Sequence, residues 1–465
     1  MSPQFRLLAA ILLFAPGLAF GQTPRVEFVW SGALQPTSIR IVAGFSGPSD
    51  SVRVALAGGD AGYFDDPYYS DYRTVDEESR TVSFSIGALE PDSTYRYAVE
   101  VEGRLDTLRA GRFHTPPDGP FSFMVAVAGC ATTGSERPVF DVIRRQEPLF
   151  FMHVGDMHYE NLETQRIEAY RNAWREVLAS PPQAELYRNV PLAYMWDDHD
   201  YGPNNSDRMS RGRVAARKAY QEMIPHYPLV AGPGNVPIHQ SFEIGRLRFI
   251  MTDLRSSRRP ASRYSNLAPS MMGERQKDWF KQELLRGKEE GDLIVWVSSV
   301  PWIYRDNPKS DSWGGYAEER REIANFLKAN EIENIVILAG DAHMVAYDDG
   351  SNSDYADGGG APIAVVQSAP LDQAGSRKGG PYSEGAYPGR TVFPPHDGQF
   401  TLMQVDDDGG DEVCLTWDSY RTRWDRPSSS RLVEMSKCYN LGPYRPADAD
   451  STSTADSTST PPVGL

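Results

Sequence analysis

The sequence is poor in cysteine, in positive charge and in long apolar runs. Its 465 residues contain 3 cysteines, so at least one thiol must stay outside any disulfide within the chain. Lys and Arg number 47 against 63 Asp and Glu, which leaves a formal net charge of −16. Such a surface repels a phosphate backbone and argues against nucleic acid as a stable partner. After residue 21 no apolar run reaches the roughly 20 residues that span a bilayer, so we expect no transmembrane segment in the mature chain.

The first residues are typical of a secretory signal. Arg6 is the only early charge, residues 7–14 are apolar, and Ala19-Phe20-Gly21 is a small-residue cleavage site. We therefore predict a signal peptide over residues 1–21 and an exported protein, either periplasmic or extracellular. The alternative is an N-terminal anchor that is not cleaved. Nothing in the sequence indicates the oligomeric state.

The cysteines divide into a pair and a single residue. Cys414 and Cys438 lie near the C-terminus, and export would make a disulfide between them reasonable. Cys130 would then be unpaired in an oxidising compartment. It is either a buried, inert thiol or a thiolate held by a metal ion.

The chain after the signal divides into three regions. Residues 22–117 read as a β-sandwich, because residues 38–42, 51–55 and 80–86 alternate with the period of a strand. Residues 89–101 resemble the fibronectin type III pattern, in which a tyrosine at the start of a late strand bonds back onto the preceding corner. The Pro-rich stretch Thr115–Pro120 separates this region from a second domain over residues 118–440. Residues 441–465 end in Ser-Thr-Ala-Asp repeats and are predicted to be disordered.

The second domain has the alternating pattern of an α/β protein. Apolar runs predict strands, and amphipathic periods of 3.6 residues predict helices between them. The predicted strands are 123–128, 149–152, 190–194, 247–251, 293–298 and 335–338, and the predicted helices are 162–178, 211–223, 274–289 and 317–329.

Three motifs rich in Asp and His follow apolar strands in this domain. They are His153-Val-Gly-Asp-Met-His-Tyr159, Met195-Trp-Asp-Asp-His-Asp200 and Ala339-Gly-Asp-Ala-His343. Carboxylates and imidazoles at the carboxyl ends of several buried strands are how an α/β protein assembles a metal site. Together the three motifs predict a two-metal hydrolase.

The order of these motifs resembles the PhoD-like (alkaline phosphatase D) branch of the calcineurin-like metallophosphatases. The resemblance covers about residues 121–439, from Gly129-Cys130 through the three motifs above. It implies a metallophosphatase α/β sandwich preceded by a fibronectin-III-like β-sandwich. It also implies a phosphoric ester hydrolase that acts on small phosphomonoesters or phosphodiesters, by in-line attack of a metal-bound hydroxide.

The same resemblance implies the metal ligands. Cys130, Tyr159 and His343 would bind Fe3+, and Asp156 would bridge to a second site completed by Asp198 and Asp341. Because the second site offers oxygen ligands only, it favours one or two Ca2+ ions, with Zn2+ or Mn2+ as the alternative. A zinc- or manganese-type phosphodiesterase is therefore the second candidate function, and a non-catalytic surface binding module is the third.

Two further residues are candidates for catalysis. His199 lies between carboxylates in a strand-end motif and could hydrogen-bond a phosphoryl oxygen or protonate the leaving group. Arg255 follows another apolar strand and could clamp a phosphate with two hydrogen bonds, or could instead pair with Asp253 or another acid nearby. Asp197 and Asp200 are expected to anchor the loop rather than to bind metal.

Overall fold

The computed structural model describes residues 24–59, 64, 66–261, 267–389 and 396–444. The predicted signal peptide and nearly all of the predicted disordered tail lie outside this part of the chain. None of the helices in the described ranges has the length and apolar composition needed to cross a bilayer.

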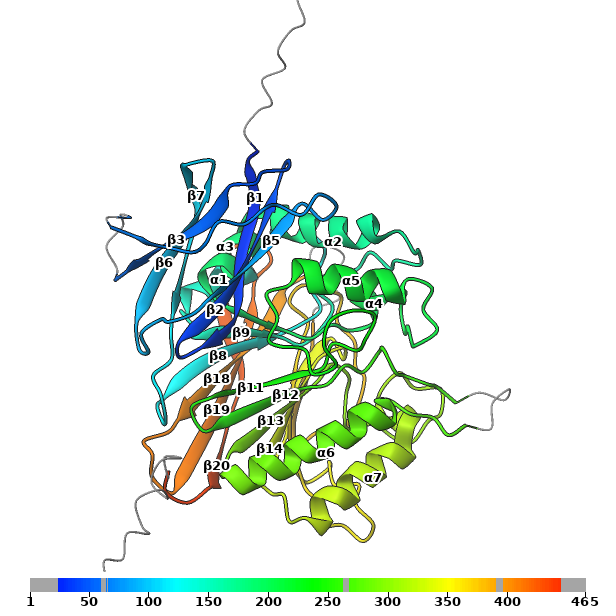
Figure 1. The fold of residues 1–465 in the computed structure, drawn as a ribbon. Helices are drawn as coiled ribbons and strands as arrows, with labels where there is room; N and C mark the ends of the chain where they lie inside the picture. Colours follow the sequence, from blue (N-terminus) through cyan, green and yellow to red (C-terminus); the bar gives the residue numbers. More distant parts are fainter. Residues whose placement is uncertain (1–23, 60–63, 65, 262–266, 390–395, 445–465) are drawn as a thin grey trace, which may run out of the picture.

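Two large sheets face each other at the centre of the molecule (Figure 1). Apolar residues of both sheets, among them Val127 and Val295, belong to one buried core. The nine-stranded sheet has the order β20-β19-β18-β8-β9-β10-β1-β2-β5, and the seven-stranded sheet has the order β11-β12-β13-β14-β16-β15-β17. The predicted α/β sandwich is therefore the observed fold, with the parallel strands β8, β9 and β10 in one sheet and β12, β13, β14 and β16 in the other.

The strands of the two facing sheets have these bounds. In the nine-stranded sheet they are β1 (Val26–Gln35), β2 (Ser38–Phe45), β5 (Thr81–Ile86), β8 (Phe123–Ala128), β9 (Phe150–His153), β10 (Leu192–Tyr194), β18 (Gly398–Asp406), β19 (Glu412–Thr422) and β20 (Ser429–Asn440). In the seven-stranded sheet they are β11 (Gln240–Ile244), β12 (Leu247–Met251), β13 (Leu293–Ser298), β14 (Ile335–Ala339), β15 (Met344–Asp348), β16 (Ala364–Ser368) and β17 (Glu384–Pro388).

Helices cover the outer faces of the two sheets. On the seven-stranded sheet, α6 (Gly273–Glu290) and α7 (Ala317–Ala329) bury Phe280 and Ile323 in a second core that also contains Trp296 of β13. The short 3-10 helix η1 (Trp313–Tyr316) leads into α7. The nine-stranded sheet carries α1 (Pro138–Arg145), α2 (Ile167–Ala179), α3 (Pro181–Asn189) and α5 (Arg213–Met223), while α4 (Asp198–Tyr201) is a single turn after β10.

The N-terminal β-sandwich is present, and one of its sheets is part of the nine-stranded sheet. Its other sheet contains β3 (Val52–Gly58), β4 (Tyr68–Tyr69), β6 (Thr94–Val101) and β7 (Arg104–His114). The N–H of Glu90 donates to the hydroxyl of Tyr95 at 2.9 Å, which confirms the predicted bond from a tyrosine back onto the corner. Strand β1 pairs in parallel with β10 at Gly32 and Leu192. A Cβ on Gly32 would lie 2.4 Å from the carbonyl oxygen of Leu192, so this junction requires glycine.

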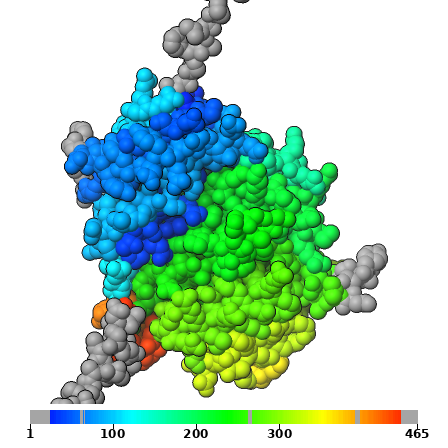
Figure 2. All heavy atoms as spheres, in the orientation of Figure 1, coloured from blue at the N-terminus to red at the C-terminus, as the bar shows by residue number. Residues whose placement is uncertain are grey.

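The two regions therefore form one continuous surface (Figure 2). The hydroxyl of Tyr97 in β6 donates to the carbonyl of Arg188 at the end of α3, at 2.8 Å. The boundary between residues 117 and 118 remains a prediction, but the regions on its two sides share a sheet. At the far edge of that sheet, Cys414 and Cys438 face each other on β19 and β20 and form a disulfide, which the sequence alone left open.

Candidate metal centre

Loops that follow five parallel strands converge on one site. Gly129 and Cys130 follow β8, the 153–159 motif follows β9, and the 195–200 motif follows β10. From the facing sheet come the loops after β12 and β14. The site therefore lies at the carboxyl ends of both sheets, where the sequence predicted it.

Glycines let these loops approach one another closely. Gly155 has φ of +114°, and a Cβ there would lie 2.6 Å from the Cβ of Asp197. A Cβ on Gly340 would lie 2.8 Å from the carbonyl oxygen of Val154. The glycine before Asp156 is thus required by contact between two loops of the nine-stranded sheet, and the glycine before Asp341 by contact between the two sheets.

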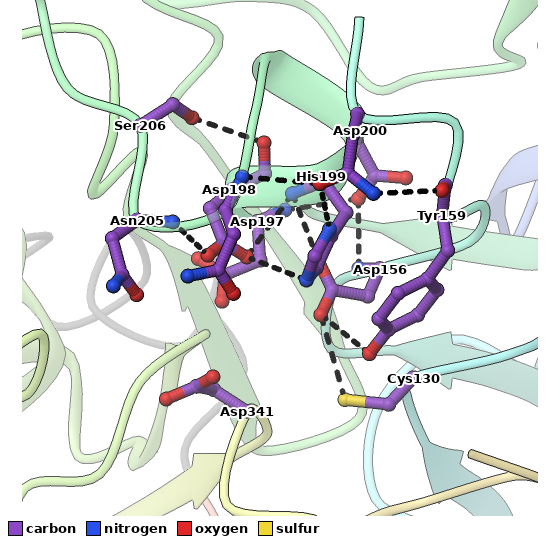
Figure 3. Close-up of polar contacts among 12 residues, drawn as sticks. Cys130, Asp156, Tyr159, Asp197, Asp198, His199, Asp200, Asn205, Ser206 and Asp341 are labelled. Atoms are coloured by element: carbon purple, nitrogen blue, oxygen red, sulfur yellow. Dashed lines mark hydrogen bonds and ion pairs between the residues drawn. The ribbon is translucent and has the colours of Figure 1, made fainter. Parts of the chain in front are cut away.

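Asp156 stands at the centre of the site (Figure 3). One of its oxygens, Oδ2, accepts a hydrogen bond from the hydroxyl of Tyr159 at 2.9 Å and lies 3.7 Å from Sγ of Cys130. The other oxygen, Oδ1, accepts the backbone N–H of His199 at 3.2 Å. The ligand atoms of Cys130, Asp156 and His343 lie within 4.8 Å of one another, and so do those of Asp156, Asp198 and His199. Asp156 belongs to both groups, which is the geometry of a bridging carboxylate.

The first group also includes Tyr159, because its hydroxyl lies 2.8 Å from Nε2 of His343. The other ring nitrogen, Nδ1, lies 2.6 Å from the carbonyl oxygen of Ala374. Since a carbonyl only accepts, Nδ1 carries the proton and Nε2 presents its lone pair to the site. This is how a metal-binding histidine is commonly held.

Asp198 and Asp341 line the other side of Asp156 (Figure 3). Asp198 Oδ2 accepts the backbone N–H of Asn205 at 2.6 Å, and its Oδ1 accepts that of His199 at 3.0 Å. Asp341 Oδ1 accepts from Nζ of Lys378 at 2.6 Å. Asp341 Oδ2 is buried and has no hydrogen-bond partner in the described residues.

Four of the six predicted metal ligands have a left-handed backbone. The φ angles are +60° at Cys130, +56° at Asp156, +57° at Asp341 and +50° at His343. Residues other than glycine seldom adopt this conformation, which costs about 1–2 kcal/mol each. Strain of this kind persists where the surrounding structure fixes a side chain for function.

The charge of the site calls for cations. Burial, followed by the charges of Asp198 and Asp197, raises the pKa of Asp156 well above its usual value. Burial likewise raises the pKa of the Cys130 thiol, and Asp156 adds to that effect. Burial opposes ionisation of Asp198 too, but the charge of Arg255, together with His199 and the backbone N–H of Asn205, lowers the pKa of that carboxyl. Closely spaced carboxylates, a thiol, a phenol and an unpartnered oxygen of Asp341 fit the binding of metal ions well.

His199 stands beside Asp156, and its backbone N–H donates to Asp156 Oδ1. Nδ1 lies 2.8 Å from Oδ1 of Asn161, an oxygen that also accepts the backbone N–H of Asn204. Asn161 thus fixes the proton on Nδ1 and leaves Nε2 free to act. The imidazole lies against the ring of Tyr159, with centroids 4.0 Å apart, and its side chain is 12% exposed.

Arg255 is fully buried and engaged by carboxylates. Its Nε donates to Asp197 Oδ1 at 2.6 Å, and its terminal nitrogens donate to both oxygens of Asp311 at 3.1 and 2.9 Å. The geometry thus favours the expected alternative of pairing with neighbouring acids over a phosphate clamp. Asp200 anchors the loop as expected, because its carboxylate accepts the backbone N–H of Asp156, Met157 and Asp197.

Sequence reasoning missed several contributors to the site. Asn161, Asp311, Lys378 and the carbonyl of Ala374 lie in loops that carry no repeated motif. Lys378 was detectable only as a cation in the Gly-rich segment between the predicted strand 335–338 and the C-terminal region. Its partner, 37 residues earlier in the chain, could not be deduced from spacing.

Facing sheets with acids, cysteine, tyrosine and histidine at their strand ends define a candidate metal centre. The chain belongs to the PhoD-like phosphatase family, a family of phosphoric ester hydrolases, whose sequence pattern matches residues 124–424.

Two comparisons agree with this assignment. The chain is 23% identical over 316 residues to alkaline phosphatase D of Bacillus subtilis (strain 168), covering 57% of this chain and 53% of that protein. The chain thus spans about half the length of this curated relative. It also matches a solved structure of PhoD with a TM-score of 0.70 at 17% identity, over 91% of both chains. The structural match shows a shared fold.

Proposed function

We propose that this protein is an exported, metal-dependent hydrolase of small phosphomonoesters or phosphodiesters. The observation that carries the proposal is that Asp156 belongs to two groups of possible metal ligands, one with Cys130 and His343 and the other with Asp198 and His199. In-line hydrolysis of a phosphate ester needs charge compensation on both the attacking and the leaving side, and paired cations provide it.

We assign the two groups to different cations. Cys130, Tyr159 and His343 would hold Fe3+ together with Asp156, because thiolate and phenolate donate strongly to a trivalent ion. Asp198 and Asp341 would complete an oxygen-only site that suits Ca2+. When bound, these cations supply Lewis acidity and make a water molecule nucleophilic near neutral pH.

His199 is the candidate for proton transfer. Its Nδ1–H is held by Asn161, so Nε2 is the atom that can donate to a phosphoryl oxygen or to the leaving alkoxide. Its Nε2 lies 4.0 Å from Asp198 Oδ1. This position fits a general acid that donates a proton without being a metal ligand.

We retain Arg255 as a residue of the catalytic site, in a positioning role. Its ion pairs fix Asp197 and Asp311, and its terminal nitrogen lies 3.9 Å from Asp198 Oδ1. Arg255 would thus hold the loop that presents Asp198 at a constant distance from Asp156.

Export is supported by two features. Residues 1–21 have the composition of a signal peptide, and the Cys414–Cys438 disulfide is a bond that persists in oxidising compartments. Edman sequencing of protein secreted from its host would show Gln22 as the first residue. A mature chain that still begins at Met1 would contradict the predicted cleavage.

The central experiment combines metal analysis with an ester assay. Purified protein is analysed for each element and then assayed with a chromogenic monoester and a chromogenic diester, before and after chelation of calcium. We expect iron and calcium in the protein, ester hydrolysis, and loss of that hydrolysis on chelation. A colourless, active protein with zinc or manganese in both sites would favour the second candidate function. A protein that holds metal but hydrolyses neither ester would favour a binding module.

Asp156→Asn and His343→Ala test the ligand assignment. Each should lose metal and lower hydrolysis by about a thousandfold, since a catalytic cation supplies several kcal/mol of transition-state stabilisation. Asp92→Asn, on an exposed corner of the sandwich, is the control and should change neither property.

A further inference from the structure

Lys378 places a positive charge next to Asp341. Its Nζ lies 2.6 Å from Asp341 Oδ1. The Lys378 side chain is 41% exposed, whereas that of Asp341 is 4% exposed. Part of the Lys378 side chain therefore reaches solvent while its ammonium group contacts the buried carboxylate.

The loop that carries Lys378 is fastened on both sides. Ser376 donates from its hydroxyl to the carbonyl of Ala342 at 2.7 Å and from its backbone to the carbonyl of His343 at 3.2 Å. Gly380 donates its N–H to the carbonyl of Ile303 at 3.0 Å. Because Ser376 and Gly380, two residues before and after Lys378, are both held by hydrogen bonds, the Lys378 backbone is fixed next to the Asp341–His343 turn.

Lys378 differs from the other basic residues of the site. Among the described basic residues that pair with Asp197, Asp198, Asp311 or Asp341, the others are Arg255, Arg258 and His199, with side chains 0%, 1% and 12% exposed. The two arginines have their guanidinium groups directed at carboxylates. Only Lys378 in this set combines a charge with substantial access from solvent.

The Lys378 side chain ends in an ammonium group, the ordinary state of lysine near neutral pH. An ammonium has three N–H donors, so the bond to Asp341 leaves two for another acceptor. Asp198 and Asp341 belong to the proposed second cation site, so these donors lie at its edge.

We propose that Lys378 is a substrate-binding residue that donates a charge-assisted hydrogen bond to a non-bridging phosphoryl oxygen. The inference rests on the proposed function and names the anion, a phosphate group, that this side chain recognises. Lys378 would keep its bond to Asp341 Oδ1 while the other oxygen of Asp341 binds a cation. A phosphoryl oxygen is the acceptor that matches its remaining donors in charge and geometry.

Inorganic phosphate is the probe, because it carries the same oxygens without a leaving group. Its dissociation constant is measured by calorimetry on the metal-loaded, full-length protein and on Lys378→Gln, Lys378→Arg and Lys288→Gln. Lys288 is the matched control: it is 40% exposed and pairs with Glu331, and it lies at the end of α6, beside the amino end of β13. Metal content of each protein and KM and kcat for a chromogenic ester are recorded in parallel.

We expect Lys378→Gln to weaken phosphate binding about tenfold or more, since hydrogen bonds to charged groups are strong. KM should rise in the same proportion, Lys378→Arg should recover part of the affinity, and Lys288→Gln should match wild type. Equal phosphate affinity in Lys378→Gln and wild type would overturn the inference. So would a loss of metal from Lys378→Gln, because Lys378 would then serve to position Asp341.

The two proposals can fail separately. If wild-type protein hydrolyses the ester while Lys378→Gln keeps its KM and phosphate affinity, only the role of Lys378 is lost. If wild-type protein holds metal and binds phosphate through Lys378 but hydrolyses no ester, only the proposed activity is lost. Failure of wild-type protein both to bind phosphate and to hydrolyse ester overturns both.

Discussion

The hydroxyl of Tyr159 lies 2.8 Å from Nε2 of His343, although 184 residues separate them in the chain. Tyr159 follows β9 of the nine-stranded sheet, and His343 follows β14 of the seven-stranded sheet. One proposed cation site is therefore built from both sheets. Its integrity depends on how the two sheets pack against each other.

Replacing Tyr159 with Phe should change the colour of the protein. A phenolate bound to Fe3+ gives a visible charge-transfer absorption, so wild-type protein should show a band that Tyr159→Phe lacks at equal iron content, while absorption from the Cys130 thiolate stays. The control is Tyr170→Phe, which loses a single bond from α2 to the carbonyl of Leu162 and should keep the band. Visible absorption spectra with iron analysis make the measurement. An unchanged band in Tyr159→Phe would show that another residue produces it.

Replacing His199 with Ala should separate chemistry from metal binding. The variant should keep its full metal content, yet kcat should fall by about 10²–10⁴-fold because a positioned general acid contributes that much. His114→Ala provides the comparison, since His114 is exposed on the sandwich and pairs with Asp92. Steady-state kinetics and element analysis give the two readouts. Normal turnover by metal-replete His199→Ala would exclude His199 from the chemistry.

Replacing Arg255 with Met should cost stability. Its partner Asp197 would keep a buried charge without this guanidinium, and Asp311 would retain Arg258 alone, so the free energy of unfolding should drop by about 3–5 kcal/mol. Arg246→Met is the comparison. It removes a buried ion pair with Asp407, at 2.6 Å, next to the amino end of β12. Denaturant unfolding should show similar losses for both variants, whereas only Arg255→Met should also lower kcat. A raised KM with unchanged stability would instead support the phosphate clamp.

His153 should make the protein less stable in mild acid. Burial lowers its pKa from 6.5 to about 3, so the folded state keeps the ring neutral where the unfolded state takes up a proton. The contribution of the buried, neutral His153 to the free energy of unfolding is complete above pH 6.5 and is lost progressively as pH falls toward 3. His153→Leu should therefore reduce the slope of unfolding free energy against pH by about 1.4 kcal/mol per unit between pH 6 and 4. Equal slopes for both proteins would refute this origin of the acid sensitivity.

Much of the fold could be predicted because apolar periodicity was strong. Helix 317–329 and strands 123–128, 247–251 and 293–298 have the predicted bounds. Helix 162–178 begins later, at Ile167, because residues 160–166 form a loop that carries Asn161 beside His199. The helices α1 and α3 were missed. Each is under ten residues long and begins at a proline, which also reads as a loop signal.

The site was predictable to the extent that strand ends could be recognised. Cys130, Asp156, Tyr159 and His343 do meet, and Asp198 lies on the other side of Asp156. Partners such as Ala374 and Lys378 could not be found. They lie in the loop between β16 and β17, and a loop has no sequence period from which its position in the fold can be predicted. The ion pairs of Arg255 were left open for the same reason: its acids lie 58 and 56 residues away.

The parallel pairing of β1 with β10 decides what can be cut from this protein. Trimming the chain back to residue 118 would strip β10 of a neighbour and leave a bare strand edge two residues from Trp196, in the loop that supplies Asp198. Bare edges invite intermolecular pairing. The strand β1 is thus part of the sheet that carries the site, and any shortened protein must keep the chain from the start of β1.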